Sequence, residues 1–359
     1  MTNLNRQTYN VIGLMSGTSL DGLDLAFCRF TVDNNAWDFE IIHAETKAYP
    51  EEWKQRLLSL ETADAISFQQ AHHDYGTYTG RLVSDFILTH RIKADFVSSH
   101  GHTIFHQPEN RFTVQVGAGS AIAAACKMPV VCDFRSLDVA LGGQGAPLVP
   151  IGDKLLFREY DYCLNLGGFA NISYEHKGKR IAYDICPVNI VMNAITEQLG
   201  KPYDDRGAMA REGMVGHYLL NELNGLPYFR QAPDSPKSLG KEWVLRNIDP
   251  LLEQYELDPN DLLCTLCEHV AVQVARTLES KSSGRLLITG GGTYNDFLVE
   301  RIRALVPLEI VIPEKKIIEF KEALIFAFLG VLRMRNEVNC LKSVTGARED
   351  NCGGAVYTF

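Results

Sequence analysis

The stretch of sequence that decides the fold is Gly13-Leu14-Met15-Ser16-Gly17-Thr18-Ser19-Leu20-Asp21-Gly22-Leu23-Asp24. The apolar run from Tyr9 to Leu14 predicts a buried strand, and the alternating run from Leu23 to Phe30 predicts its antiparallel neighbour. The turn between them contains glycines, which let backbone approach closely, and hydroxyl side chains. Such a turn forms a concavity suited to phosphate, and Asp21 can hold a divalent cation, directly or through water. An ordinary Ser/Gly hairpin is the alternative for this turn taken alone.

The same layout occurs again about 155 residues later, measured from Gly13 to Gly168. Each copy reads strand, glycine turn, strand, hairpin, strand. The strands of the second copy are predicted at Tyr162–Leu166, Ile172–Glu175 and Arg180–Tyr183. Asp184 follows the third of these strands. A repeated supersecondary layout is stronger evidence than either glycine turn alone, and it predicts that both turns face one cleft.

Length and composition limit the class of protein. A chain of 359 residues predicts two domains, and 46% hydrophobic with 22% charged residues is ordinary globular composition. The net charge of −9 argues against a general binder of nucleic acid or acidic membranes. The polar N-terminus lacks the apolar core of a signal peptide, and no apolar run approaches the length of a membrane span. Nine scattered cysteines favour reduced thiols, so we expect a soluble, cytoplasmic protein.

Two further stretches are candidates for ligand binding. The strand predicted at Arg285–Thr289 runs into Gly290-Gly291-Gly292, a run that lets backbone approach an anionic ligand ahead of a helix. The polar stretch 133–150 is predicted to be a rigid connection between domains. Its side chains Asp133, Arg135, Asp138 and Gln144 are candidates to face a cleft, and internal ion pairs of a linker are the alternative.

Two groups of metal-ligating residue types are interpreted without a metal. His100, His102 and His106 follow a predicted strand, and their spacing does not secure a zinc geometry, so substrate contacts are favoured. Cys264 and Cys267 lie near His269 on a predicted helix whose apolar neighbours favour a place in the core.

Together these features suggest a site for ATP between two domains. Phosphoryl transfer depends on positioning and on neutralising charge, which backbone donors and a bound Mg²⁺ supply. A carboxylate must also take a proton from the attacking group, and Asp184 is the candidate. Asp21 competes for that role, but its place inside the phosphate turn favours a metal or water contact. Capping of the following helix is the alternative for Asp184.

The sequence resembles the anhydro-N-acetylmuramic acid kinase family, within the superfamily of actin-like ATPases, sugar kinases and Hsp70-type ATPases. Besides the stretch quoted first, the motifs that carry the resemblance are Ser99-His100-Gly101-His102-Thr103, Asp133-Phe134-Arg135, Gly142-Gly143-Gln144-Gly145-Ala146-Pro147-Leu148-Val149-Pro150, Asn165-Leu166-Gly167-Gly168-Phe169-Ala170-Asn171 and Thr289-Gly290-Gly291-Gly292. They occur in order over nearly the whole chain. The resemblance implies an α/β fold of two ribonuclease-H-like domains with ATP in a cleft between them.

The resemblance also implies domain limits and site residues. The expected domains are residues 1–130, completed by about 340–359, and residues 131–339. The residues expected to bind ATP are Gly17, Thr18, Ser19, Leu20, Asp21, Gly22, Leu23, Asp24, Gly168, Gly290 and Gly291. The family's catalytic aspartate falls on Asp184, and Asp21 is the candidate Mg²⁺ contact. Candidate substrate contacts are Ser16, His100, Arg135 and Asp138. A homodimer is implied by the resemblance only.

The implied reaction is ATP-dependent conversion of 1,6-anhydro-N-acetylmuramic acid to N-acetylmuramic acid 6-phosphate, in recycling of cell-wall sugars. Asp184 would activate the water that opens the anhydro bridge. A kinase for an ordinary hexose or amino sugar and a non-catalytic, ATP-gated sugar sensor are the alternatives. The chain departs from the family pattern at Cys186-Pro187-Val188, where Gly-Pro-Gly is usual, and at His102, where Gln is common.

Overall fold

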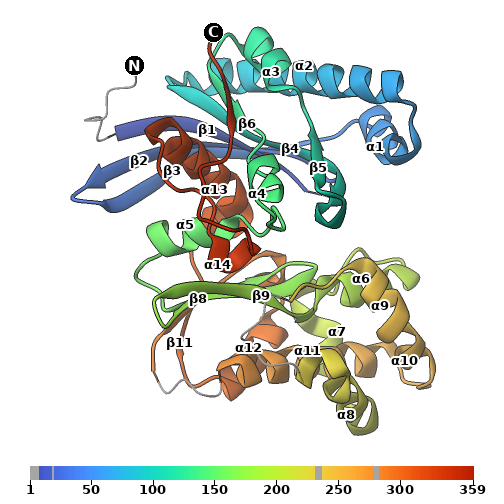
Figure 1. Cartoon of the computed structure of the whole chain (residues 1–359). Helices are drawn as coiled ribbons and strands as arrows, with labels where there is room; N and C mark the ends of the chain where they lie inside the picture. The colour runs from blue at the N-terminus through green and yellow to red at the C-terminus, as the bar shows by residue number, and fades with distance from the viewer. Residues whose placement is uncertain (1–7, 18–19, 231–236, 279–282) are drawn as a thin grey trace. The chain divides into compact units, whose positions relative to one another are not determined.

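The computed structural model describes residues 8–17, 20–230, 237–278 and 283–359. The chain divides into two compact units. The first, unit 1, consists of the residues up to Leu156 together with Phe320–Phe359, and the second, unit 2, consists of Phe157–Glu319. Each unit contains its own sheet (Figure 1).

The sheet of unit 1 is built around the predicted first strand. Its strands are β1 (Thr8–Ser16), β2 (Gly22–Asp33), β3 (Ala36–Ala48), β4 (Phe96–Gln107), β5 (Phe112–Val116), β6 (Val130–Cys132) and β12 (Ala355–Tyr357). They lie in the order β12-β6-β4-β1-β2-β3, with β5 paired to β4. The predicted antiparallel pairing of the first two strands is confirmed, with Gly13 opposite Ala26. β4 runs parallel to β1, and β6 runs parallel to β4.

Helices cover both faces of this sheet. The helical segments of unit 1 are α1 (Glu51–Ser59), η1 (Leu60–Thr62), α2 (Ala65–His90), η2 (Pro108–Asn110), α3 (Gly119–Cys126), α4 (Ser136–Ala140), α5 (Val149–Leu156), most of α13 (Lys315–Arg335) and α14 (Lys342–Thr345). Helices α2 and α3 lie over one face, and α13 lies against the other (Figure 1). A Cβ on Gly13 would lie 2.1 Å from the carbonyl oxygen of Ala323, so close packing of α13 on β1 requires glycine there.

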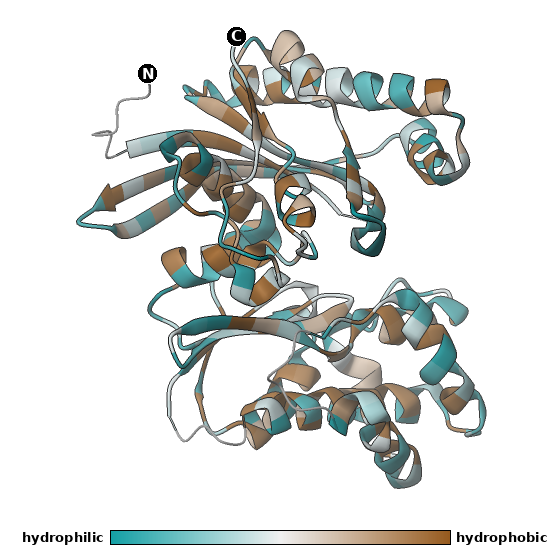
Figure 2. Ribbon diagram, viewed as in Figure 1, coloured by the Kyte–Doolittle hydropathy of each residue, from teal (hydrophilic) through white to brown (hydrophobic). Residues whose placement is uncertain are grey.

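Apolar side chains on the strands explain why the sheet of unit 1 is covered. Ile12, Leu14, Leu25 and Val97 are completely buried in one core cluster together with Phe86 of α2. Burial of such side chains is the main favourable contribution to folding. The tip of the β2–β3 hairpin, Asn34 and Asn35, is hydrophilic (Figure 2).

Unit 2 repeats the strand order of unit 1. Its strands are β7 (Tyr162–Leu166), β8 (Phe169–His176), β9 (Lys179–Pro187), β10 (Arg285–Thr289) and β11 (Glu309–Val311). They lie in the order β11-β10-β7-β8-β9. β8 pairs antiparallel with both β7 and β9, whereas β10 and β11 run parallel to β7. Both units thus have the ribonuclease-H-like arrangement, and the internal repeat predicted from the two glycine turns is confirmed.

The helices of unit 2 surround a separate core. They are α6 (Asn189–Gln198), η3 (Asp205–Gly207), α7 (Ala208–Glu212), α8 (His217–Gly225), η4 (Pro227–Arg230), α9 (Lys241–Asn247), α10 (Asp249–Glu253), α11 (Pro259–Leu278), η5 (Gly291–Tyr294) and α12 (Asp296–Leu305). Cys264, Cys267 and His269 of α11 are all buried. His269 Nδ1 lies 2.8 Å from Asn224 Oδ1, and burial lowers the pKa of this imidazole to about 3. The predicted core position of this group is confirmed.

The stretch predicted to connect the domains is folded as part of unit 1. Residues 131–156 include the end of β6, which pairs with β4 and β12, and the helices α4 and α5. The prediction of a loop between domains was therefore wrong for this stretch. Glycines and prolines signal irregular backbone, but they do not reveal which core a segment joins. The compact units change at 156/157 and 319/320, not at the expected limits 130/131 and about 339/340.

Among the described residues, no helix has both the length and the apolar character needed to cross a membrane.

Candidate functional site

The glycine turn between β1 and β2 in unit 1 is called the first glycine corner. Gly17 and Leu20 belong to it, with the Leu20 N–H donating to the Gly17 carbonyl oxygen at 3.4 Å. Leu20 adopts a left-handed backbone with φ of 60°, and the side chain of Asp21 is exposed. Thr18 and Ser19, both predicted to bind ATP, lie outside the described residues. The exposed carboxylate of Asp21 remains available to a cation or to water.

The remaining predicted residues of this corner belong to β2. A Cβ on Gly22 would lie 2.4 Å from Lys47 O, so glycine is needed there for the close approach of β3. Leu23 is buried, and Asp24 accepts a hydrogen bond from Thr46 Oγ1 at 2.5 Å. These three residues hold the strands together directly beside the corner.

Ser16, at the end of β1, is part of a buried polar chain. The Tyr49 hydroxyl donates to Ser16 Oγ at 2.7 Å, and Tyr49 is also hydrogen-bonded to the Tyr75 hydroxyl. Ser16 Oγ lies 2.8 Å from His102 Nδ1, and burial lowers the pKa of His102 to about 4. A neutral imidazole accepts the Ser16 O–H at Nδ1 and carries its own proton on Nε2. Because Ser16 is only 2% exposed, this position does not support the predicted substrate contact.

His100 and Arg135 are brought together 35 residues apart in the chain. Arg135 Nε and Nη2 lie 3.1 and 2.9 Å from His100 Nε2, while His100 Nδ1 lies 2.9 Å from Gly101 O. The guanidinium only donates and the carbonyl only accepts, so His100 is the neutral tautomer with its proton on Nδ1. Burial and the neighbouring Arg135 hold the pKa of His100 well below its usual range. Arg135 Nη1 also donates to Gly145 O at 2.6 Å, which fixes the orientation of the guanidinium.

Asp138 is at the centre of a buried network in unit 1. Its Oδ2 accepts the Gly145 N–H at 2.8 Å, and its Oδ1 accepts from Thr345 Oγ1, Asn351 Nδ2 and Cys340 Sγ. The residue has no exposed surface. This position does not support the predicted substrate contact, since the carboxylate joins the stretch after β6 to the C-terminal residues 340–351. Residues 340–359, which were expected to complete the first domain, belong to unit 1.

The second glycine corner is Gly167-Gly168, between β7 and β8, and the third is Gly290-Gly291-Gly292, after β10. They lie next to each other in unit 2. Gly168 is exposed, and its carbonyl oxygen accepts the N–H groups of Val188 and Ile190 at 2.8 and 3.3 Å. Gly290 has φ of 87°, and a Cβ there would lie 2.7 Å from the carbonyl oxygen of Leu166. Gly291 is exposed, and a Cβ there would have no atom nearer than 3.9 Å. Gly290 therefore serves the packing of the corner, whereas Gly168 and Gly291 present backbone to solvent.

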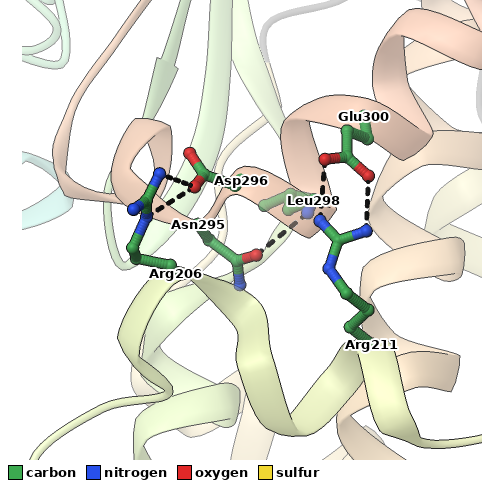
Figure 3. A network of polar contacts seen from close by, with 6 residues as sticks. All are labelled: Arg206, Arg211, Asn295, Asp296, Leu298 and Glu300. Atoms are coloured by element: carbon green, nitrogen blue, oxygen red, sulfur yellow. Dashed lines mark hydrogen bonds and ion pairs between the residues drawn. The ribbon is translucent and has the colours of Figure 1, made fainter.

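The helix after the third corner is fixed by charged side chains (Figure 3). Arg206 Nη2 lies 2.6 Å from Asp296 Oδ2, and Arg211 forms two hydrogen bonds with Glu300 at 2.7 and 2.8 Å. Asn295 caps α12 by accepting the Leu298 N–H at 2.9 Å. The two ion pairs join α12 to η3 and α7.

Asp184 lies inside β9, at an irregularity in its pairing with β8. Ala170 is opposite Cys186 and Asn171 is opposite Asp184, so Ile185 is the extra residue of a bulge. The Asp184 carboxylate accepts the Leu239 N–H at 2.9 Å, and burial raises the pKa of this carboxyl. The alternative role as a helix cap is wrong, because α6 begins after Val188 without a side-chain cap.

The altered motif beside Asp184 continues the strand and then turns into α6. The side chains of Cys186 and Val188 are completely buried in the core cluster of unit 2. The pairing of Pro187 with Phe169 extends β9 to the glycine corner, where the Val188 N–H binds Gly168 O. The two side chains that replace the usual glycines therefore add to the core of unit 2.

The structure adds residues that the sequence did not single out. Tyr49 and Tyr75 surround Ser16, and Tyr228, Lys237 and Leu239 contact Asp184. Each of them lies between 33 and 59 residues from Ser16 or Asp184 in the sequence, and none belongs to a motif quoted above. No local pattern could identify them, because folding alone brings them together.

A magnesium site made only of protein groups is not present among the described residues. No group of three or more His, Cys, Asp or Glu side chains there is placed to hold a metal ion. Mg²⁺ in phosphoryl-transfer enzymes is commonly bound by one or two carboxylates together with phosphates and water. The single exposed carboxylate of Asp21 at the first corner fits that mode.

Two units with the ribonuclease-H-like strand order, each with a glycine corner after its first strand, give the chain the fold of the actin-like ATPases and sugar kinases. A family model for anhydro-N-acetylmuramic acid kinase matches residues 9–359. The chain therefore belongs to the anhydro-N-acetylmuramic acid kinase family, a family of phosphotransferases.

Two relatives with the same family name agree with this assignment. The anhydro-N-acetylmuramic acid kinase of Vibrio cholerae serotype O1 is 34% identical over 366 residues, covering 96% of this chain and 97% of the relative. The protein of the same name from Coxiella burnetii strain Dugway is 36% identical over 372 residues, covering 96% of each. Among solved structures, component A of the (R)-2-hydroxyglutaryl-CoA dehydratase of Acidaminococcus fermentans aligns with a TM-score of 0.44 at 11% identity, covering 89% of this chain and 96% of that one.

Proposed function

We propose that this protein phosphorylates 1,6-anhydro-N-acetylmuramic acid with ATP and opens the anhydro bridge with water, giving N-acetylmuramic acid 6-phosphate and ADP. The observation that carries the proposal is the Asp184 carboxylate, set at a strand bulge in a chain whose match to the kinase family extends from residue 9 to 359. The role is recycling of cell-wall sugars.

Asp184 acts as the general base in this proposal. One carboxylate oxygen is held by the Leu239 N–H, and the other takes a proton from water as that water attacks the anomeric carbon. The bond from the anomeric carbon to O6 breaks, and O6 takes the γ-phosphoryl group of ATP. Burial raises the pKa of Asp184, which makes the carboxylate a stronger base than an exposed aspartate.

The glycine corners supply backbone donors for the nucleotide. We assign phosphate contacts to the corner from Gly17 to Asp21 and to the exposed backbone at Gly168 and Gly291. Backbone N–H groups stabilise phosphate charge without having to reorganise during the reaction. Asp21 would hold the Mg²⁺ that accompanies ATP, and such an ion neutralises charge on the transferred phosphoryl group.

Arg135 is the group that suits the carboxylate of the sugar's lactyl substituent. Its Nε donates to His100, and each terminal nitrogen donates one hydrogen bond, to His100 and to Gly145. A guanidinium has five N–H donors, so one remains on each terminal nitrogen. This fixed fork is complementary to a carboxylate.

Coupled ADP release tests the proposed function. Purified protein and Mg-ATP are incubated with 1,6-anhydro-N-acetylmuramic acid, N-acetylmuramic acid, N-acetylglucosamine and glucose in parallel. We expect ADP release with the anhydro sugar, and in ¹⁸O-water we expect the heavy atom on the anomeric carbon of the product. Phosphorylation of a plain hexose but not of the anhydro sugar would overturn the proposal.

A further inference from the structure

The outer edge of β9 is held by a segment distant in the sequence. β9 is the last strand in the order of its sheet, so the outward backbone groups of Asp184 pair with no strand among the described residues. The Asp184 N–H donates instead to Lys237 O at 3.1 Å, and the Tyr228 hydroxyl donates to Asp184 O at 2.6 Å. Both main-chain groups of Asp184 are thereby fixed.

The same segment holds one side of the carboxylate. The Leu239 N–H donates to Asp184 Oδ2 at 2.9 Å, two residues after the carbonyl that accepts the Asp184 N–H. Among the described residues, the carboxylate of Asp184 accepts only this hydrogen bond, and its Oδ1 accepts none. The contacts thus distinguish the two oxygens of the carboxylate.

Cation–π and aromatic contacts connect the residues that bind Asp184. Lys237 Nζ lies 4.6 Å from the ring centroid of Tyr228 and 5.2 Å from that of Tyr183, distances typical of cation–π contacts. The Tyr228 ring also lies 5.5 Å from the ring of Trp243 on α9. The side chain of Lys237 therefore connects the residue before Asp184 to the tyrosine that binds the carbonyl of Asp184.

We propose that Tyr228, Lys237 and the Leu239 N–H form a clasp that positions Asp184, fixing Oδ2 and leaving Oδ1 to take the proton. The inference rests on the proposed role of Asp184 as the base. Tyr228 and Lys237 are positioning residues, since they act on the reaction only through Asp184. A displacement of a reacting group by about 1 Å lowers turnover by about 100-fold, so fixing the strand edge has a direct catalytic consequence.

A titration of the Asp184 carboxyl is influenced by the ionisable groups beside it. They are Cys186 on β9, Tyr228 on η4 and Lys237 after it. Burial raises the pKa of both the Cys186 thiol and the Tyr228 phenol, so both are neutral at pH 7. Burial lowers the pKa of Lys237. The Leu239 N–H lowers the pKa of Asp184 against the effect of burial, so loosening the clasp moves that pKa upward.

Carbon-13 titration of the Asp184 carboxyl tests the clasp independently of turnover. The protein is labelled at aspartate carboxyl carbons, and Asp184→Asn identifies the resonance. Tyr228→Phe removes only the hydroxyl that binds Asp184 O and keeps the ring beneath Lys237. The matched control is Tyr255→Phe, which removes a phenol that is hydrogen-bonded to Glu222 in the same unit. If Tyr228→Phe does not fold, Lys237→Gln, which retains the backbone carbonyl, is titrated in its place.

We expect the Asp184 titration midpoint to move to higher pH in Tyr228→Phe and to stay in place in Tyr255→Phe. With the anhydro sugar, kcat should fall about tenfold in Tyr228→Phe, while KM for ATP stays within about twofold. An unchanged Asp184 midpoint in a folded Tyr228→Phe variant overturns the clasp. Absence of turnover by the wild type overturns the proposed function instead, and the titration still decides the clasp.

Discussion

The two units share one strand order but use their polar side chains differently. In unit 1, two buried polar side chains are bound within the protein: Ser16, beside the first corner, to His102 and Tyr49, and Asp138, after β6, to the C-terminal residues. In unit 2, the corner consists mainly of glycine backbone, and the carboxylate of Asp184 has one oxygen bound and one without a hydrogen bond among the described residues. Polar side chains in two units with the same strand order therefore need not have the same role.

This difference separates residues that stabilise the fold from residues that act on a ligand. A buried carboxylate with all its hydrogen bonds made inside the protein contributes to stability, and its removal leaves donors unpaired. A carboxylate with one oxygen left unbound, at a bulge on an outer strand, contributes less to the fold and can take part in chemistry. The comparison predicts loss of stability for variants in the network of unit 1 and loss of turnover for Asp184.

The largest effect is expected for Asp184→Asn. The amide cannot accept the proton, and general-base catalysis contributes about 10²–10⁴-fold, so kcat should fall by about three orders of magnitude. ATP affinity, measured by calorimetry, and the melting temperature should stay close to the wild-type values, since only one hydrogen bond holds the side chain. Near-normal turnover would remove Asp184 from the role of base and end the contrast with Asp138.

Asp138→Ala should be the most destabilising change. The substitution leaves the Gly145 N–H and the Thr345 and Asn351 side-chain donors without their acceptor. Each buried, unpaired donor costs about 1–3 kcal/mol, so we expect the free energy of unfolding to fall by about 3–5 kcal/mol in urea titrations. Asp33→Ala, at an exposed strand end, is the control and should change it by less than about 0.5 kcal/mol. Equal effects of the two substitutions would contradict the stabilising role of Asp138.

His102 should make the stability of the protein depend on pH. Its pKa is lowered from 6.5 to about 4 by burial, so the unfolded chain binds a proton below pH 6.5 that the folded chain does not. The stability is complete above pH 6.5 and is lost as the pH falls from 6.5 to 4, by at most about 3 kcal/mol. His102→Gln keeps hydrogen-bonding capacity without titrating, so its unfolding free energy should fall less over this range. Parallel pH profiles for the two proteins would show that another group is responsible.

The smallest effects separate two adjacent glycines in unit 2. Gly290→Ala places a Cβ 2.7 Å from Leu166 O at φ of 87°, and we expect a loss of about 1–3 kcal/mol in unfolding free energy. Gly291→Ala meets no atom within 3.9 Å, so stability should be kept while KM for ATP rises severalfold. Thermal unfolding and initial-rate kinetics measure both variants. Unchanged KM in Gly291→Ala would remove that backbone from the nucleotide site.

Local sequence predicted the strands well because their signals are local. The apolar runs at Tyr9–Leu14 and Tyr162–Leu166 were identified as strands, and both are paired as expected. Gly13 allows α13 to pack closely on β1. The sequence shows only that a small residue stands there, not which helix it contacts. The stretch 133–150 belongs to unit 1 although its sequence predicts a connection between domains, because glycines and prolines indicate backbone shape and not the core that a segment joins.

Candidate site residues were harder to judge, since the same side-chain types can stabilise or react. Ser16 and Asp138 were expected to contact substrate, and only the structure shows that they are buried and bound. The sequence predicts Asp184 just after a strand and before a helix, whereas it lies within β9 with its carboxylate bound to Leu239. Tyr228, 44 residues away, belongs to no motif.

The amino-acid sequence by itself determined the duplicated α/β design, the family and the identity of the candidate base, because strand periodicity, glycine turns and ordered motifs are properties of neighbouring residues. The tertiary structure alone decided which polar groups are buried with their partners and which keep an unbound oxygen. That distinction depends on contacts between residues far apart in the chain, and such contacts exist only after the chain has folded.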